Sequence, residues 1–259
     1  MDLGLKGKLA VVTGASKGIG LAVTRGLVEE GAHVVAGARE SSSDLNSLVE
    51  AGSVQAAELD LSEPSAPARL VALAGDRIDI LVNNVGAAPP RPEGFLHVTD
   101  DQWMDTINLD LMAAVRTTRS ALPIMLGAGG GAIVMVTSVN AFLPDPLVID
   151  YCAAKGALAN FSKALSKEVG RKGVRINTVS PGPVATDLWL GKHGVAATVG
   201  YASGKRAEDV ATAAANDAVT GRFSRPEEVA DLVLLLASER TANITGSNFT
   251  IDGGLTPTL

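Results

Sequence analysis

One stretch decides the fold of this 259-residue chain: Lys8-Leu-Ala-Val-Val-Thr-Gly-Ala-Ser-Lys-Gly-Ile-Gly20. Its first half is an apolar run typical of a buried strand, and its second half places Gly14, Gly18 and Gly20 just before a helical pattern. Glycine lets the backbone turn sharply and approach a pyrophosphate, and the N-terminus of the next helix attracts negative charge. The stretch therefore predicts a strand–turn–helix unit that binds a dinucleotide, with the spacing G-x-x-x-G-x-G rather than G-x-G-x-x-G.

Short apolar runs alternate with longer helical segments along the rest of the chain. This alternation predicts βαβ units and a parallel sheet covered by helices on both faces. We expect an α/β fold with a single domain over residues 1–259, a Rossmann-type doubly wound sheet of about seven strands. The expected strands are 8–13, 33–37, 54–57, 78–82, 131–137, 174–179 and 247–251, and the expected helices are 18–30, 42–51, 64–74, 100–126, 150–171 and 226–238.

Residues 187–221 depart from this alternation. The segment is rich in alanine, contains Trp189 and Tyr201, and is long for a connection. One interpretation is a helical excursion that packs on the domain or on a neighbouring subunit. We favour a lid over the substrate, because long loops at the ligand edge of a fold tend to be functional.

Composition argues against several classes of function. The chain has 22 basic and 28 acidic residues, a net charge of −6, and therefore lacks the basic footprint of a nucleic-acid-binding protein. We find no signal peptide and no apolar run of about 18 residues, so we expect a cytoplasmic protein that does not bind membranes. The single cysteine, Cys152, rules out an internal disulfide, and no metal-ligand spacing occurs.

Ser138, Tyr151 and Lys155 are the candidate reacting groups. Tyr151 and Lys155 are four residues apart, so both can point from the same face of a helix. A phenol has a pKa of about 10, which a nearby ammonium lowers by favouring the phenolate. Ser138 ends an apolar run, which predicts that its hydroxyl lies at the C-terminal edge of the sheet, where ligands bind. The three residues together predict a proton donor with its activator.

Five motifs, in their order and approximate spacing, resemble one family: the short-chain dehydrogenases/reductases. The resemblance covers nearly the whole chain and rests on Thr13–Gly20, Asn83–Gly86, Ser138, Tyr151–Lys155 and Pro181–Thr186. In outline the chain is most similar to 3-oxoacyl-(acyl-carrier-protein) reductases and related ketoreductases.

The resemblance implies a set of residues that bind a nicotinamide dinucleotide. Asp60 and Leu61 would contact the adenine, and Val184 and Thr186 would hold the nicotinamide carboxamide. Family members usually have alanine where Val85 stands, which is a mild increase in bulk. The full expected set is Gly14, Ser16, Lys17, Gly18, Ile19, Gly20, Arg39, Asp60, Leu61, Asn84, Val85, Gly86, Tyr151, Lys155, Pro181, Gly182, Val184 and Thr186.

The end of the second strand indicates which dinucleotide binds. An NAD site normally has a carboxylate there for the ribose hydroxyls, but the family's acidic position is Ala38 in this chain and Arg39 follows it. A guanidinium holds a 2′-phosphate that a carboxylate would repel. Lys17, inside the glycine loop, adds a second positive charge. We therefore expect NADP(H) in preference to NAD(H).

The resemblance also assigns roles to the reacting groups. Tyr151 would donate a proton to the substrate oxygen, Lys155 would lower the tyrosine pKa and bind the nicotinamide ribose, and Ser138 would hydrogen-bond the carbonyl. Many members have a fourth catalytic residue, an asparagine, at the position that Asp110 occupies here. Asn108 lies two residues away and would point elsewhere on a helix. We expect Asp110 to keep the proton relay but to alter its pH dependence.

The function predicted from these residues is NADPH-dependent reduction of a ketone to a secondary alcohol. Two alternatives remain open: an alcohol dehydrogenase that works oxidatively, and a regulator that binds NADP(H) without turnover. By analogy with the family we expect a homotetramer or homodimer. Residues that flank the reacting groups are expected to line the pocket for a small carbonyl or alcohol substrate: Val139, Asn140, Ala141, Pro183, Trp189 and Leu190.

Overall fold

Seven parallel strands form one sheet in the computed structural model, which describes residues 2–258. Their spatial order is β3-β2-β1-β4-β5-β6-β7, so the sheet grows outwards in one direction from β1 and in the other from β4. The predicted doubly wound parallel sheet is confirmed. The strands are β1 Leu9–Thr13, β2 His33–Ala38, β3 Val54–Glu58, β4 Ile80–Asn83, β5 Gly131–Val136, β6 Val174–Pro181 and β7 Asn248–Ile251.

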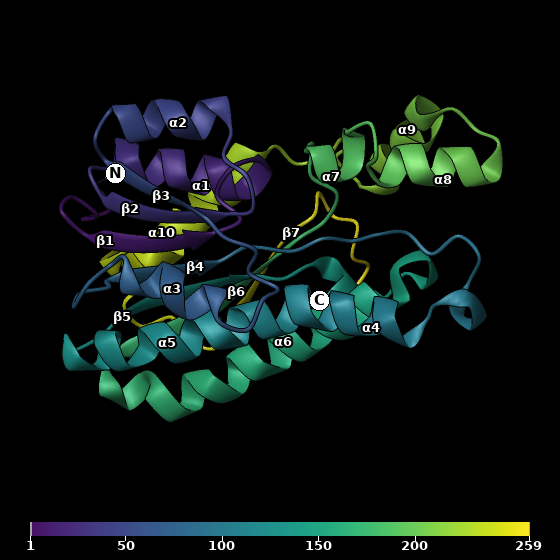
Figure 1. Cartoon of the computed structure of the whole chain (residues 1–259). Helices are drawn as coiled ribbons and strands as arrows, with labels where there is room; N and C mark the ends of the chain where they lie inside the picture. The colour runs from purple at the N-terminus through teal and green to yellow at the C-terminus, as the bar shows by residue number, and fades with distance from the viewer. Residues whose placement is uncertain (1, 259) are drawn as a thin grey trace.

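Helices cover both faces of this sheet (Figure 1). One face carries α1 (Gly18–Glu29), α2 (Ser43–Glu50) and α10 (Pro226–Ala237), and the other carries α3 (Ala66–Ala72), α5 (Ala113–Gly127) and α6 (Ile149–Val169). The C-terminal ends of β1 and β4 meet where the strand order reverses, and open α/β sheets bind ligands at that point.

The strand β1 shows why the sequence reads as a continuous apolar run. Val11 packs into the core under α3, α5 and α6, whereas Ala10 and Val12 pack under α1 and α10. Successive side chains of a strand point to opposite faces, so a strand that is buried on both faces must be apolar at every position.

The expected helix 100–126 is broken into three parts. It begins as α4 (Asp100–Ile107), which Thr99 and Gln102 cap by reciprocal hydrogen bonds, and it ends as α5. Between them lies a π-helical turn, Asn108–Met112. A π turn closes its hydrogen bonds one residue later than an α turn, so it changes the direction of the side chains that a continuous helix would present.

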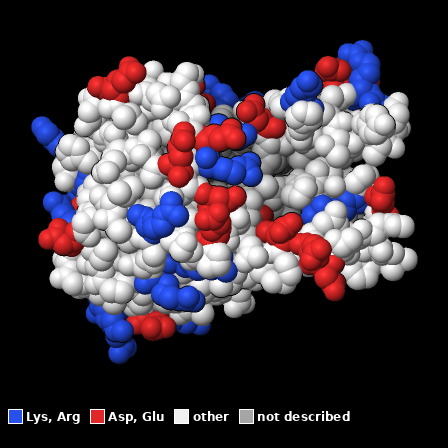
Figure 2. Space-filling view, viewed as in Figure 1, with Lys and Arg blue, Asp and Glu red and all other residues white. Residues whose placement is uncertain are grey.

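Residues 187–221 form three short helices that stand beyond the C-terminal edge of the sheet (Figure 1). These are α7 (Asp187–Leu190), α8 (Val195–Ser203) and α9 (Ala207–Asp217), and α8 packs against α9. Across from them lie α4 and the short helical turn Phe95–His97. Figure 2 shows these two parts as separate lobes with the surface indented between them. Further short turns are Val139–Ala141, Pro146–Val148, Gly170–Lys172 and Glu239–Thr241.

The charges on the face shown in Figure 2 are mixed, with basic and acidic side chains interspersed. Within residues 2–258, no helix combines the length and the apolar character needed to cross a membrane.

Candidate active site

The glycine loop between β1 and α1 has a geometry that fits an anionic group. Gly14 and Gly18 have positive φ angles of 67° and 54°, which residues with side chains rarely adopt. A Cβ on Gly20 would collide with the carbonyl oxygen of Gly14. No side chain caps the first N–H groups of α1, and its first turn has no carboxylate. These free donors and the positive end of the helix dipole suit a pyrophosphate.

Asn84 ties the end of β4 to this loop. Its side-chain amide donates to the carbonyl oxygens of Thr13 and Gly14 at 3.0 and 3.2 Å. The Thr13 hydroxyl accepts from the backbone N–H groups of Asn84 and Val85 at 2.9 and 3.1 Å. The end of β4 and the glycine loop therefore lie at the same edge of the sheet, in one hydrogen-bonded unit.

Arg39 and Asp60 lie together at the ends of β2 and β3. Hydrogen bonds from the hydroxyl and N–H of Ser62, at 2.7 and 2.9 Å, hold the pKa of the Asp60 carboxyl below its ordinary value. The positive charge of Arg39 adds to this lowering. Arg39 itself is exposed and makes no ion pair within the described part of the chain. Its guanidinium is therefore available to a phosphate.

The segment that follows β6 approaches the glycine loop from the other side. Gly182 is held by a backbone hydrogen bond to Ile251 at 3.0 Å, and Val184 is buried. Thr186 lies against the loop, because a Cβ on Gly18 would be 3.1 Å from the Thr186 methyl group. The structure thus brings Pro181–Thr186 and the glycine loop to one place, as a shared nucleotide site requires.

Ser138, Tyr151 and Lys155 are buried and meet at the same edge. Ser138 follows β5, and its hydroxyl accepts from the Asn140 N–H at 3.1 Å. Lys155 Nζ lies 5.5 Å from the centre of the Tyr151 ring and donates to the Val136 carbonyl oxygen at 3.4 Å. The α6 helix presents both side chains from one face, as their spacing of four residues requires.

Asp110 faces the same cluster from the π turn. Its Oδ1 lies 3.4 Å from Lys155 Nζ, and the two side chains are only 1% and 3% exposed. The Ala87 N–H donates to the carboxylate at 3.2 Å, and Gly86 lies so close that a Cβ there would be 2.5 Å from Oδ1. Asn108, two residues earlier, instead accepts from Arg116 at 3.2 Å. Asp110, and not Asn108, therefore contacts the reacting groups.

Burial dominates the ionisation of Asp110. It raises the pKa of the carboxyl to about 6, although the charge of Lys155 and the hydrogen bond from Ala87 oppose the change. The Lys155 ammonium therefore has a carboxylate partner at neutral pH.

The pKa of Tyr151 differs from the sequence-based expectation. Lys155 was expected to lower it, but burial of the phenol and the nearby negative charge of Asp110 raise it above its ordinary value. A hydrogen bond with Ser138 opposes this change. The expectation is wrong for this arrangement because burial of the phenol and the negative charge of Asp110, which also pairs with the Lys155 ammonium, both disfavour the phenolate. Tyr151 is held in its protonated form.

This geometry agrees with a family match. A family model described as enoyl-(acyl carrier protein) reductase matches residues 14–256, which includes the glycine loop and the reacting groups. The chain belongs to the short-chain dehydrogenase/reductase family. It is an oxidoreductase of that family, and the resemblance that the sequence indicated is confirmed.

Several relatives of this short-chain dehydrogenase/reductase match it over at least 98% of its length. The L-sorbose reductase of Gluconobacter frateurii, solved in complex with NADPH and L-sorbose, is 35% identical with a TM-score of 0.91 and full coverage of both chains. The 3-oxoacyl-(acyl-carrier-protein) reductase of Vibrio harveyi is 33% identical over 98% of this chain and 99% of its own. The L-xylulose reductase of Mesocricetus auratus is 34% identical over 98% of each chain.

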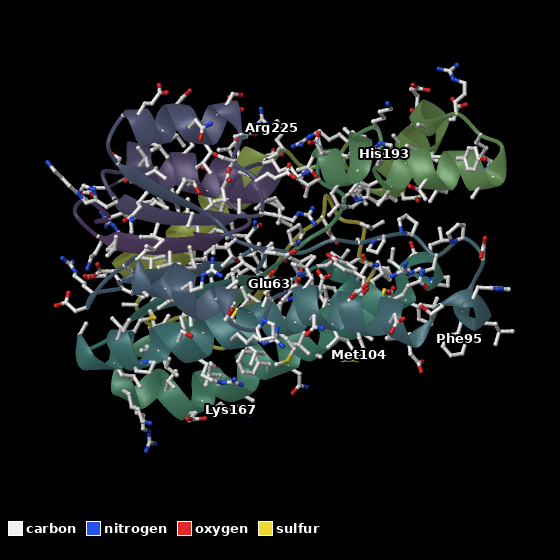
Figure 3. The ribbon with its side chains drawn as sticks, in the orientation of Figure 1. Glu63, Phe95, Met104, Lys167, His193 and Arg225 are labelled. Carbon is white, nitrogen blue, oxygen red and sulfur yellow. The ribbon has the colours of Figure 1, made fainter. Side chains whose placement is uncertain are left out.

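The residues expected around the substrate differ in how far they are buried. Asn140 and Trp189 are half-buried, and the Trp189 ring packs 5.3 Å from that of Phe223. Val139 is buried. Figure 3 shows His193 between α7 and α8, across from Phe95 and Met104. The remaining expected residues, Ala141, Pro183 and Leu190, lie in the same two segments after β5 and β6.

Three polar residues beside the site, two of them buried and one partly buried, were not identified as functional from the sequence. Arg91 lies in the loop after β4, Thr106 near the end of α4, and Asp150 directly before Tyr151. The available signal was a carboxylate in the apolar start of α6 and an arginine among prolines and glycines. Neither feature of the sequence predicts the contact between the Arg91 and Asp150 side chains.

Proposed function

We propose that this chain reduces a ketone to a secondary alcohol with NADPH. One observation carries this proposal. The buried side chains of Ser138, Tyr151, Lys155 and Asp110 lie close together at the edge of the sheet that also holds the glycine loop. When bound, the nicotinamide would supply the hydride. The protein must then bind the carbonyl oxygen, donate one proton to it and keep water away from the reaction.

Tyr151 is the proton donor in this proposal. Its raised pKa keeps the phenol protonated through the neutral range, as a general acid requires. Ser138 holds the carbonyl oxygen through its hydroxyl, and Lys155 binds the nicotinamide ribose. Positioned acid–base groups typically contribute about 10²–10⁴-fold to a rate.

Asp110 takes the place of the family's asparagine in the proton relay. Its carboxylate accepts from the Ala87 N–H and pairs with Lys155, so it anchors the ammonium. Because the pKa of Asp110 is about 6, protonation below that pH weakens this anchor. We expect the reduction rate to fall as the pH drops through this range.

NADPH is proposed in preference to NADH. Arg39 is exposed and without an ion pair in the described chain, and Ala38 leaves no carboxylate to repel a 2′-phosphate. The solved L-sorbose reductase relative binds NADPH. Lys17 lies 4.0 Å from Asp187 at the start of α7, so its charge is shared with the lid segment.

We propose that residues 187–221 act as a substrate lid and that small ketoses are the first substrates to test. Relatives named for L-sorbose and L-xylulose match this chain over at least 98% of its length. The 3-oxoacyl thioesters are the second class, since a relative with that name is nearly as similar.

A substrate panel tests the proposal directly. NADPH consumption is measured with L-sorbose, L-xylulose, 3-oxoacyl thioesters and simple ketones, and the alcohol product is identified by chromatography. NADPH binding without turnover on any ketone would favour a regulator, and turnover only of alcohols with NADP⁺ would favour an oxidative dehydrogenase. The expected homotetramer or homodimer stays a prediction, and light scattering would check it. The cytoplasmic location also stays a prediction.

A further inference from the structure

A second buried ion pair lies beside the reacting groups. Arg91 Nη2 and Nε donate to Asp150 Oδ2 at 2.6 and 3.1 Å. The Thr106 hydroxyl donates to the same oxygen at 2.8 Å, and Arg91 Nη2 also reaches this hydroxyl at 3.5 Å. We call Arg91, Thr106 and Asp150 the arginine cluster.

The burial of the arginine cluster makes its pairing important. Asp150 is fully buried and Arg91 is only 13% exposed. Burial by itself would raise the pKa of the Asp150 carboxyl, but hydrogen bonds from Arg91 and Thr106 and the charge of Arg91 outweigh it, so this pKa lies below its ordinary value. Removing one partner from a buried pair leaves an uncompensated charge, which is strongly unfavourable.

The arginine cluster joins three segments around the reacting groups: the loop after β4, α4 and the start of α6. Arg91 belongs to the loop after β4, which also contains Ala87, the donor to Asp110. Thr106 lies on α4, four residues before Asp110, which lies on the π turn. Asp150 lies on α6, directly before Tyr151. The Arg91 N–H also donates to the Leu147 carbonyl oxygen at 2.6 Å, so the loop is fastened to the start of α6 by backbone as well.

We propose that Arg91, Thr106 and Asp150 are positioning residues that hold Tyr151, Lys155 and Asp110 in alignment for proton transfer. The proposal rests on the reductase function proposed above. The cluster acts through other residues: Asp150 fixes the helix turn that carries Tyr151, and Thr106 fixes the helix that leads into the π turn.

The same cluster controls the charge around Asp110. From α6, Lys155, Tyr151 and Asp150 act on this carboxyl, and from the loop after β4 it accepts from the Ala87 N–H. The negative charge of Asp150 raises the pKa of Asp110. Without the Arg91 guanidinium this charge would be uncompensated, so the pKa of Asp110 would rise further and Lys155 would lose its anchor at a higher pH.

The kinetic test uses Arg91→Met, which removes the charge but keeps the apolar stem. Displacement of reacting groups by about 1 Å costs on the order of 10²-fold in rate, so we expect kcat for ketone reduction to fall by about 10- to 100-fold. The KM for NADPH should stay unchanged, and the acid limb of the pH–rate profile should move to higher pH. In the double variant Arg91→Met/Asp150→Asn the acid limb should return to its original position while kcat stays low.

A second measurement does not depend on activity. Cys152 is the single thiol of the chain, is buried, and lies two residues after Asp150. Its rate of labelling by a thiol reagent therefore reports opening of the start of α6. We expect Arg91→Met and Thr106→Val to increase this rate and to leave NADPH affinity, measured by fluorescence, unchanged.

Arg222→Met is the matched control, because Arg222 forms an equally direct pair with Glu228, at 2.7 Å, on the surface. It should change neither kcat, the pH profile nor the Cys152 labelling rate. The proposal is overturned if Arg91→Met lowers only thermal stability, or if it matches Arg222→Met in all three readouts. If Arg91→Met does not fold, Thr106→Val and the double variant decide by the same readouts. If the parent reduces no ketone, the proposed function fails, whereas the labelling rates still test the cluster.

Discussion

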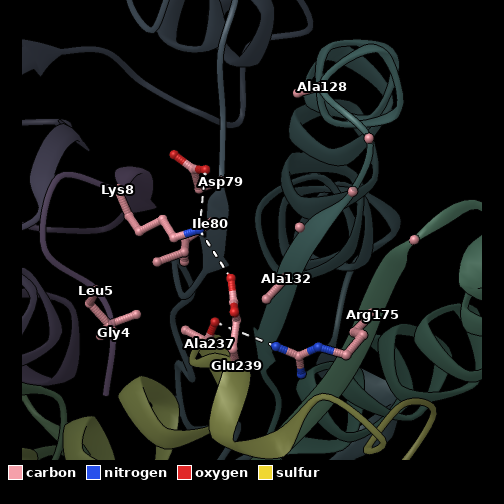
Figure 4. A pocket seen from close by; sticks show the side chains of 14 residues that line it. Gly4, Leu5, Lys8, Asp79, Ile80, Ala128, Ala132, Arg175, Ala237 and Glu239 are labelled. Atoms are coloured by element: carbon pink, nitrogen blue, oxygen red, sulfur yellow. Dashed lines mark hydrogen bonds and ion pairs between the residues drawn. The ribbon is translucent and has the colours of Figure 1, made fainter. Parts of the chain in front are cut away.

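Two lysine–aspartate pairs lie at opposite edges of the same sheet. At the C-terminal edge, Lys155 Nζ lies 3.4 Å from Asp110, and both side chains are almost fully buried. At the N-terminal edge, Lys8 lies 3.8 Å from Asp79 and 3.3 Å from Glu239, and all three side chains have access to solvent. Figure 4 shows this second group in a pocket of about 350 Å³ that Arg175 also lines.

The two pairs have the same residue types but differ in their exposure to solvent. A solvent-exposed pair contributes only about 0–1 kcal/mol, because water screens the attraction. At the buried edge the loss of hydration raises the pKa of Asp110 to about 6. Burial of the phenol, together with the negative charge of Asp110, raises the pKa of Tyr151. A lysine–aspartate pair therefore forms a solvent-exposed ion pair at one edge, whereas at the other edge it shifts the pKa of the proposed proton donor, Tyr151.

The largest expected effect comes from removing the phenol of the buried edge. Tyr151→Phe should lower the ketone reduction rate by about 10²–10⁴-fold, because it deletes the proton donor but keeps the ring. Thermal unfolding and NADPH binding should change little. Residual activity close to that of the parent would show that another group donates the proton.

Arg39→Ala tests an exposed cation that forms no ion pair within the described part of the chain. A charge-assisted hydrogen bond contributes roughly 1.5–3 kcal/mol, so the preference for NADPH over NADH should fall by about 10- to 100-fold. Steady-state kcat/KM values with the two cofactors measure it. An unchanged ratio would mean that Arg39 does not contact the 2′-phosphate.

Asp110→Asn removes the charge of the buried pair and keeps the size of its side chain. Tyr151 and Tyr201 are the two tyrosines of the chain, and Tyr201 is 93% exposed, so a Tyr201→Phe background leaves one phenol to observe. We expect Asp110→Asn to let Tyr151 ionise at lower pH, seen as near-ultraviolet phenolate absorbance. The acid limb of the reduction profile should also disappear. If neither changes, Asp110 is not part of the proton path.

The same variant should change how stability depends on pH. The pKa of Asp110 is about 6 in the folded protein and about 3.9 in an unfolded chain, so folding favours the protonated form. Its contribution to stability is complete below the unfolded pKa and is lost as the pH rises to about 6. In Asp110→Asn, denaturant midpoints between these two pH values should depend less on pH than in the parent.

The smallest effect is expected at the opposite edge. Lys8→Met should lower the free energy of unfolding by no more than about 1 kcal/mol, as is usual for pairs open to solvent. The reduction rate and its pH profile should stay the same. A change in the pH profile would show that the two edges of the sheet are coupled.

Local sequence was sufficient to predict the architecture. The alternation of apolar runs predicted every strand to within two residues at each end, since a strand buried on both faces must be apolar throughout. The prediction of one continuous helix over 100–126 was wrong in its middle. Residues 108–112 form a π-helical turn, whose hydrogen bonds span five residues, and this turn has no clear signal in the sequence.

The sequence by itself determined the glycine loop, the spacing of Tyr151 and Lys155, and the identity of Asp110, because each depends on residue type and local geometry. The tertiary structure alone decided that Asp110 pairs with Lys155 and that Arg91 meets Asp150, 59 residues away along the chain. It also reversed the expected change in the pKa of Tyr151. The physical reason is that the energy of a charge depends on its loss of water and on its partners, and long-range packing sets both.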